Sequence, residues 1–169
     1  MDAIKKKFYE AATQKLLHDL DDMGLDKLSR MRAKNFVLLF RDSFKQDSVK
    51  HAAFSTEIGN DYKLFPYDSY GFCRASSLSF MALMPKKQWQ LMYINEIWVH
   101  GPHFYLRHVD SGKVFDLTFD QYEVEGLTVP YYFGRPTKPD ANARHTVARF
   151  VNAIGLDFSV ALKGLQGKE

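Results

Sequence analysis

Apolar residues recur at helical spacing over the first 45 positions of the chain. From residue 2 to residue 22 an apolar stripe follows a period near 3.6 and ends at Met23-Gly24, where the glycine suits a helix end. A second stripe, over residues 26–45, alternates with arginine and lysine side chains. We therefore predict two amphipathic helices that form a helical N-terminal element over residues 1–45.

The pattern changes twice in the next forty residues. Residues 46–72 contain Gly59-Asn60 and Pro66, which are loop markers, and we predict irregular structure there. Residues 73–84 regain helical spacing, and Pro85 stops this third predicted helix.

Aromatic and branched residues then dominate, which is typical of strands. We predict strands over residues 89–99, 104–109 and 113–117, and a further short strand over 129–133. Asp110-Ser111-Gly112 is a hairpin-turn signal between the second and third strands.

Pro136 and Pro139 are expected to break the chain before a last helix, over residues 141–154, that Gly155 ends. Helices and strands are thus segregated along the sequence, which predicts an α+β fold. We expect one domain over residues 1–169, with a catalytic-like core over 60–135 and a C-terminal helical part over 140–169.

Composition agrees with one folded domain. The chain is 46% apolar and 25% charged, and at 169 residues it can bury a real core. A single cysteine excludes an intrachain disulfide and fits a reducing compartment. The N-terminal residues lack the features of a signal peptide, and no apolar stretch approaches the ~20 residues that span a bilayer. We expect a cytoplasmic protein with no membrane association, located in the host cytoplasm if a phage encodes it.

Charge argues against nucleic acid as the partner. The net charge is +3, and the basic residues are scattered apart from Lys5-Lys6-Lys7 and Lys86-Lys87. Nucleic-acid binding usually needs a concentrated basic patch. We expect a solvated surface instead; retention on heparin at low salt would contradict this.

Cys73 opens the third predicted helix and is the main candidate for chemistry. A helix N-terminus favours the thiolate, which is the nucleophilic form of cysteine. The alternative is that Cys73 is a small buried apolar residue, as free cysteines often are. His103 in a predicted strand and Asp116 after a turn favour the nucleophile, because an imidazole can accept the thiol proton and a carboxylate can orient the ring.

Strand register leaves a second carboxylate open as the orienting group. A two-residue turn at Ser111-Gly112 would pair Asp116 with Arg107, about 13 Å along the strand from His103. Asp120 would then lie across from His103. Either a bulge or a longer loop shifts this pairing, or Asp120 orients the ring in place of Asp116.

The residues from His103 to Thr118 resemble the transglutaminase-like pattern, in which a histidine strand precedes a strand ending in Asp-x-Thr. More narrowly, Gly71-Phe72-Cys73 together with the run from Asp116 to Tyr122 resembles the small bacterial and phage proteins called YunG-like. The resemblance covers roughly residues 66–135. It implies a papain-like α+β fold with Cys73 as nucleophile, His103 as base and Asp116 as orienting residue.

One position departs from the papain-like pattern. Those enzymes often carry a glutamine before the cysteine that helps to bind the oxyanion, and this chain has Phe72 there. The backbone N–H of Cys73 and a second donor would have to form an oxyanion hole. Asn60, Tyr70 and Gln88 are the candidates for that donor.

A zinc site is the weaker interpretation of the histidines. Cys73, His100, His103 and His108 could be grouped as ligands, but paired Cys/His spacings are missing. We expect no metal and no other cofactor, and we expect surface positions for the remaining histidines, His108 included.

Two functional hypotheses follow. The first is a cysteine-dependent hydrolase or acyltransferase of the peptidase, deamidase or amidase type, acting on a protein or peptide substrate. The second is a non-catalytic binding or inhibitor protein, bacterial or phage, that docks through the helical hairpin or an aromatic cleft.

Overall fold

The computed structural model describes residues 3–44, 46–53, 71–85, 87–95, 102–157 and 159. Over these residues the protein is a mixed α+β structure built around a four-stranded antiparallel sheet. Its elements are α1 (Ala3–Asp21), α2 (Lys27–Ser43), α3 (Asp47–Ala53), α4 (Cys73–Leu83), β1 (Trp89–Ile94), β2 (His103–His108), β3 (Val114–Phe115), α5 (Asp120–Glu123), the 3₁₀ helix η2 (Tyr131–Phe133), β4 (Arg135–Pro136) and α6 (Ala143–Ala153).

The first two helices pack against each other as the apolar stripes predicted. The side chain of Asp26 caps α2 by accepting hydrogen bonds from the backbone N–H groups of Leu28 and Ser29, both at 2.9 Å. Such a cap satisfies N–H groups that have no partner within the helix. The apolar face of α2 is buried, from Ala33 through Phe36, Val37 and Phe40.

The sheet has the strand order β3-β2-β1-β4. β1 and β2 pair along their whole length, from Trp89 opposite His108 to Ile94 opposite His103. β3 pairs with β2, and β4 lies on the other edge, where Pro136 is opposite Met92. A proline is tolerated at an edge because no further strand needs its missing N–H.

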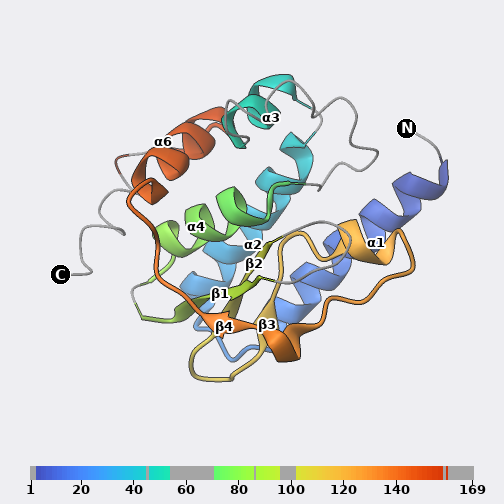
Figure 1. Cartoon of the computed structure of the whole chain (residues 1–169), viewed down its shortest axis with the longest axis horizontal. Coiled ribbons are helices and arrows are strands. Elements are labelled where there is room, and N and C mark those ends of the chain that lie inside the picture. Colours follow the sequence, from blue (N-terminus) through green and yellow to red (C-terminus); the bar gives the residue numbers. More distant parts are fainter. Residues whose placement is uncertain are drawn as a thin grey trace.

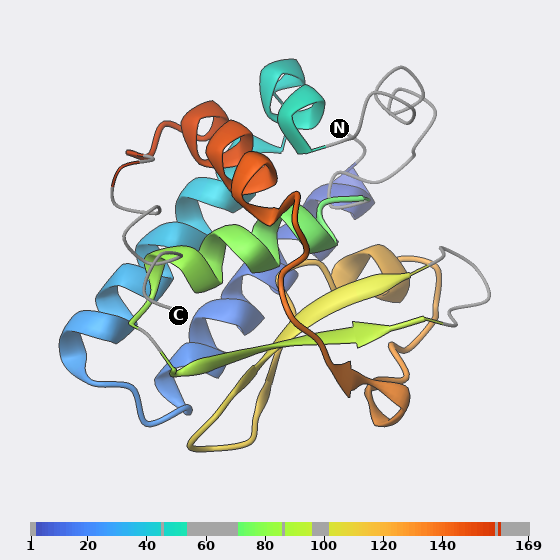
Figure 2. The ribbon, with the colours of Figure 1, turned by 60° about the vertical axis from the view of Figure 1, so that its left-hand side comes forward.

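Helix α4 lies between the sheet and the helices α2 and α6. It contacts β1 and β2 on one side and α6 and α2 on others, and α3 packs on α6 (Figure 1). Figure 2 shows α4 running between α6 and the strands. Every residue from Ala75 to Ala82 is buried. Helix α4 is therefore covered on all sides over these residues.

Phenylalanine rings hold the start of α4 in the core. The Phe72 ring centroid lies 5.1 Å from that of Phe44, 5.9 Å from Phe40 and 6.0 Å from Phe150. These rings come from α2 and α6, so Phe72 fixes the first turn of α4 against both helices. Aromatic pairs at such distances stabilise by about 0.5–1.5 kcal/mol beyond the area they bury.

Two expectations need correction, and part of a third lies outside the described residues. Residues 47–53 form α3, although irregular structure was predicted for 46–72; residues 54–70 of that segment lie outside the described part of the chain. Residues 129–133 do not form a strand but contain η2, and the short strand follows it at Arg135–Pro136. The strand predicted over 89–99 is observed as β1 up to Ile94, and residues 96–99 lie outside the described part of the chain.

None of the described helices combines the length and the apolar composition that crossing a bilayer requires.

Candidate active site

Cys73 is the first residue of α4 and is half-buried. The chain reaches it through Gly71, which has a φ of 80°, a left-handed conformation that side chains resist. Phe72 follows with no side-chain cap on the helix end. The local sequence Gly-Phe-Cys thus turns the chain, anchors it in the core and places the thiol at the helix N-terminus.

His103 is the first residue of β2 and is fully buried. It lies opposite Ile94, the last residue of β1. The ring of Tyr122 meets it edge-on with centroids 5.0 Å apart, and Tyr105, two residues along the strand, stacks at 6.3 Å. The imidazole is therefore held on several sides by packing.

Asp116 contacts this ring directly. Its Oδ2 lies 2.6 Å from His103 Nε2, and both side chains are buried. The same oxygen accepts a hydrogen bond from the Tyr131 hydroxyl at 2.9 Å. The other oxygen, Oδ1, accepts from the backbone N–H of Thr118 at 3.0 Å and from its hydroxyl at 3.3 Å.

The length of the hairpin loop explains why Asp116 reaches His103. The backbone N–H of His108 bonds to the carbonyl of Lys113, so the loop spans residues 109–112 and a two-residue turn is wrong. Leu106 then pairs with Phe115. Continuing that register would place Asp116 beside Tyr105, a diagonal neighbour of His103 on the same face. The longer loop was one of the two alternatives that the sequence left open.

Cys73 lies close enough to the same ring to favour the protonated imidazole. Burial opposes a charged ring, but the carboxylate of Asp116 and then Cys73 outweigh it and raise the pKa of His103 to about 10. Cys73, His103 and Asp116 are thus brought together from α4, β2 and the end of β3.

Asp120, the alternative orienting residue, lies elsewhere. Its two oxygens are each 2.9 Å from the guanidinium of Arg41, in a bidentate ion pair. The expected position of Asp120 across from His103 does not occur, because the chain leaves the sheet after Phe115 and turns into α5. In this arrangement Asp116 is the carboxylate on the ring.

Two further expectations, for Gln88 and for His108, do not agree with the structure. Gln88 precedes Trp89, which pairs with His108, so it lies at the far end of β1 from His103 and is not placed to bind an oxyanion. His108 is buried, not at the surface; its Nδ1 is 2.9 Å from the Ser111 hydroxyl, and burial lowers its pKa. Asn60, Tyr70 and His100 lie outside the described residues. Among the described side chains no group of three or more His, Cys, Asp or Glu is arranged to hold a metal ion.

Several site residues were not assigned a role from the sequence. Gln121 Nε2 lies 3.4 Å from His103 Nδ1 and donates to the Thr118 hydroxyl at 3.2 Å. Tyr131 was taken for a strand residue and instead donates to Asp116. Thr118 and Gln121 belong to the Asp-Leu-Thr-x-x-Gln run, so that motif was the signal; for Tyr131 the sequence offered none.

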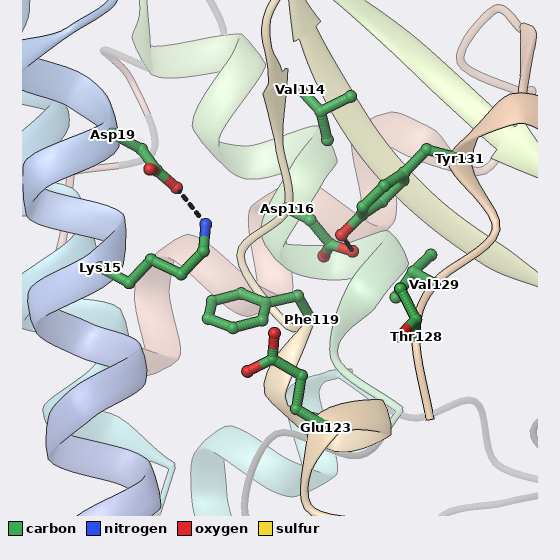
Figure 3. Close-up of a pocket in the computed structure, with 9 residues that line it drawn as sticks. All are labelled: Lys15, Asp19, Val114, Asp116, Phe119, Glu123, Thr128, Val129 and Tyr131. Atoms are coloured by element: carbon green, nitrogen blue, oxygen red, sulfur yellow. Dashed lines mark hydrogen bonds and ion pairs between the residues drawn. The ribbon is translucent and has the colours of Figure 1, made fainter. Parts of the chain in front are cut away.

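A cavity of about 150 Å³ adjoins Asp116 (Figure 3). Figure 3 shows Tyr131 directed at Asp116, with Lys15 paired to Asp19 on α1 across the cavity. Glu123 also lines it, and burial raises the pKa of that carboxyl. Neither Cys73 nor His103 lines this cavity, so it is not where the thiol would meet a substrate.

No protein-family model matches this sequence, and no curated protein or solved structure is significantly similar to it. The function is therefore argued from the site alone.

Proposed function

We propose that the protein is a cysteine-dependent hydrolase or acyltransferase in which Cys73 is the nucleophile, His103 the general base and acid, and Asp116 the orienting residue. The observation that carries the proposal is the buried 2.6 Å contact of His103 Nε2 with Asp116, on a ring whose protonated form Cys73 also favours. A nucleophile beside a base that a third group orients is the arrangement that thiol catalysis needs.

Proton transfer from the Cys73 thiol to His103 gives the thiolate that reacts. Because Nε2 contacts Asp116, Nδ1 is the nitrogen left to accept that proton. The thiolate attacks the carbonyl carbon of an amide, thioester or isopeptide bond, and the C–N or C–S bond breaks as His103 returns the proton to the leaving group. Water or an amine then attacks the thioacyl carbonyl and releases Cys73.

The negative charge that develops on the carbonyl oxygen during attack must be stabilised by hydrogen-bond donors. The first N–H groups of a helix have no partner within the helix, and Phe72 provides no side-chain cap to α4. The backbone N–H of Cys73 is therefore our proposed donor to the oxyanion. A papain-like arrangement, with a cysteine helix packed on an antiparallel sheet, is the fold that we propose on the strength of this site and of the resemblance around Gly71-Phe72-Cys73.

A thiol probe tests the proposal. We expect chloroacetamide to label Cys73 at pH 7 at least about tenfold faster than N-acetylcysteine, because a free thiol is only a few per cent ionised there. His103→Ala should remove that advantage, and intact-mass measurement of the alkylated protein gives both rates.

A matched control is available on the same strand. His108→Ala removes a second buried histidine of β2, at the end away from Cys73, and should leave the labelling rate unchanged. Equal rates for the wild type, His103→Ala and N-acetylcysteine would overturn the proposal. If both histidine variants label slowly and only the wild type gives the spectrum of a folded protein, the labelling rate of Asp116→Asn serves as the test instead.

A second candidate function is favoured by one surface feature. Leu28, Met31 and Leu38 follow one another at helical spacing on α2 and are each about half exposed. A non-catalytic binding protein that docks through the helical hairpin would use such a stripe. Under this candidate Cys73→Ala retains the biological effect, whereas Leu38→Asp abolishes it.

A further inference from the structure

Gln121 closes a ring of hydrogen bonds around the candidate site. His103 Nε2 contacts Asp116 Oδ2 at 2.6 Å, and Asp116 Oδ1 contacts the Thr118 hydroxyl at 3.3 Å. That hydroxyl is 3.2 Å from Gln121 Nε2, which in turn is 3.4 Å from His103 Nδ1. Each member of the ring is buried.

The donors in this ring fix its direction. A carboxylate only accepts, so the single hydrogen of the Thr118 hydroxyl goes to Asp116, and the hydroxyl accepts from Gln121. The nitrogen end of the Gln121 amide therefore faces both Thr118 and the ring. An amide N–H needs a lone pair on Nδ1, which only the neutral ring with its hydrogen on Nε2 offers.

The protonated ring cannot accept this hydrogen bond. An imidazolium carries hydrogens on both nitrogens, so its Nδ1–H would face the N–H of Gln121 and neither could accept. The hydrogen bond from Gln121 is thus available to one protonation state alone.

Other groups around the ring also affect whether His103 is neutral or protonated. Those that face His103 from the described elements are Asp116 at the end of β3, Cys73 from α4, Gln121 and Tyr122 from α5, Tyr105 from the same strand and Ile94 from β1. Of these, Asp116 and Cys73 both favour the imidazolium. Gln121 is the polar neighbour that favours the neutral ring.

We propose that Gln121 is a positioning residue that holds the His103 ring in place by donating to Nδ1 of its neutral form, so that it opposes the thiolate–imidazolium pair and must release Nδ1 when the Cys73 proton is transferred. The catalytic role of Gln121 rests on the proposed function, whereas its hydrogen bond to His103 does not depend on that function. The test is therefore made in Cys73→Ala protein, where no thiol chemistry takes part.

The imidazole nitrogens of His103 report the effect directly. In ¹⁵N-histidine-labelled Cys73→Ala protein, with His103 assigned by a His103→Gln difference spectrum, we expect the neutral ring to carry its hydrogen on Nε2. Adding Gln121→Met removes the amide at similar length and should raise the protonation midpoint of His103 by about half to one pH unit, the size of one modest hydrogen bond.

Gln88→Met is the matched control. It makes the same substitution at the far end of β1, and the His103 midpoint should not move. A neutral ring with its hydrogen on Nδ1, or an unchanged or lower midpoint in folded Gln121→Met, would overturn the inference. If Gln121→Met does not fold, a hydrogen on Nδ1 of the neutral ring in the parent protein would still overturn the inference. An inert Cys73 in the labelling test would reject the proposed function and leave this result standing.

Discussion

At the scale of single residues, Asp116 is the carboxylate that contacts the His103 ring. Both of its oxygens are engaged, Oδ2 by His103 and Tyr131 and Oδ1 by the backbone and hydroxyl of Thr118. Burial and this carboxylate raise the pKa of the Tyr131 hydroxyl, and the carboxylate raises the pKa of His103 against the effect of burial.

The stability of the protein should depend on pH through this pair. The ordinary pKa of histidine is 6.5, and in the folded protein that of His103 is raised to about 10, against the effect of burial, by Asp116 and Cys73. Between these values the folded chain keeps a proton that the unfolded chain releases. Rising pH therefore favours unfolding, and the stabilisation present below pH 6.5 is lost as the pH passes through about 10.

Urea unfolding of wild type and Asp116→Asn at intervals from pH 6.5 to 10 measures this effect. The wild type should lose its advantage over Asp116→Asn as the pH rises. Asp120→Asn removes the other candidate carboxylate, which pairs with Arg41, and its difference from wild type should stay constant over the same range. A constant difference for Asp116→Asn too would contradict the assigned coupling.

At the scale of elements, the start of α4 combines a left-handed Gly71 with a core-bound Phe72. Ala at such a backbone position costs about 1–2 kcal/mol. We expect Gly71→Ala to lower the free energy of unfolding by that amount and also to slow the alkylation of Cys73, since the strain falls two residues before the thiol.

Gly155 offers a comparison at the end of α6. Its φ is 79°, against 80° for Gly71, and an added Cβ would have nothing within 4 Å. Gly155→Ala should therefore lose similar stability in thermal unfolding while Cys73 reacts at the wild-type rate. Equal labelling rates in the two alanine variants would show that the geometry before Cys73 does not control the thiol.

The long elements could be predicted from the sequence because their periods repeat. α1 and α2 offer 19 and 17 residues over which the apolar positions recur. α5, η2 and β4 have only four, three and two residues, too few for any period, and β4 even contains Pro136. Such short elements are fixed by tertiary contacts, so local sequence could not reveal them.

The candidate site was predictable by residue type but not by register. The order of Cys73, His103 and Asp116 along the chain indicated the three side chains, whereas the choice between Asp116 and Asp120 depended on a loop length that Asp110-Ser111-Gly112 does not specify. Arg41 was interpreted as a polar position of its helix. Its place four residues after Val37, on the buried face, was the signal that it is a core residue.

At the scale of the whole molecule, Arg41 joins the helical hairpin to the segment that carries Asp116. Its guanidinium binds Asp120, donates to the Tyr9 carbonyl at 3.2 Å and to the Leu117 carbonyl at 3.4 Å, and its Nε donates to the Thr13 hydroxyl at 3.1 Å. It thus connects α1, α2 and the turn after Asp116. The N-terminal helices are in this way part of the support of the candidate site.

Breaking the Arg41–Asp120 pair should cost far more stability than breaking the Arg74–Asp140 pair. Arg41 is 1% exposed and Asp120 13%, whereas Arg74 and Asp140 are 28% and 57% exposed. Breaking a buried pair leaves a charge without compensation and costs about 3–5 kcal/mol, while exposed pairs contribute about 1 kcal/mol or less. We expect Arg41→Met to approach the first range and Arg74→Met the second, in urea unfolding at pH 7.

A double-mutant cycle separates the charge from the packing of the arginine. Asp120→Asn alone leaves Arg41 buried and unpaired, so the double variant Arg41→Met/Asp120→Asn should lose less stability than the sum of the two single variants. Arg41→Met should also slow Cys73 alkylation, because the turn that presents Asp116 loses its anchor on α2. Additive losses, with alkylation at the wild-type rate, would mean that the hairpin merely covers the core and that Asp116 keeps its place on His103 without it.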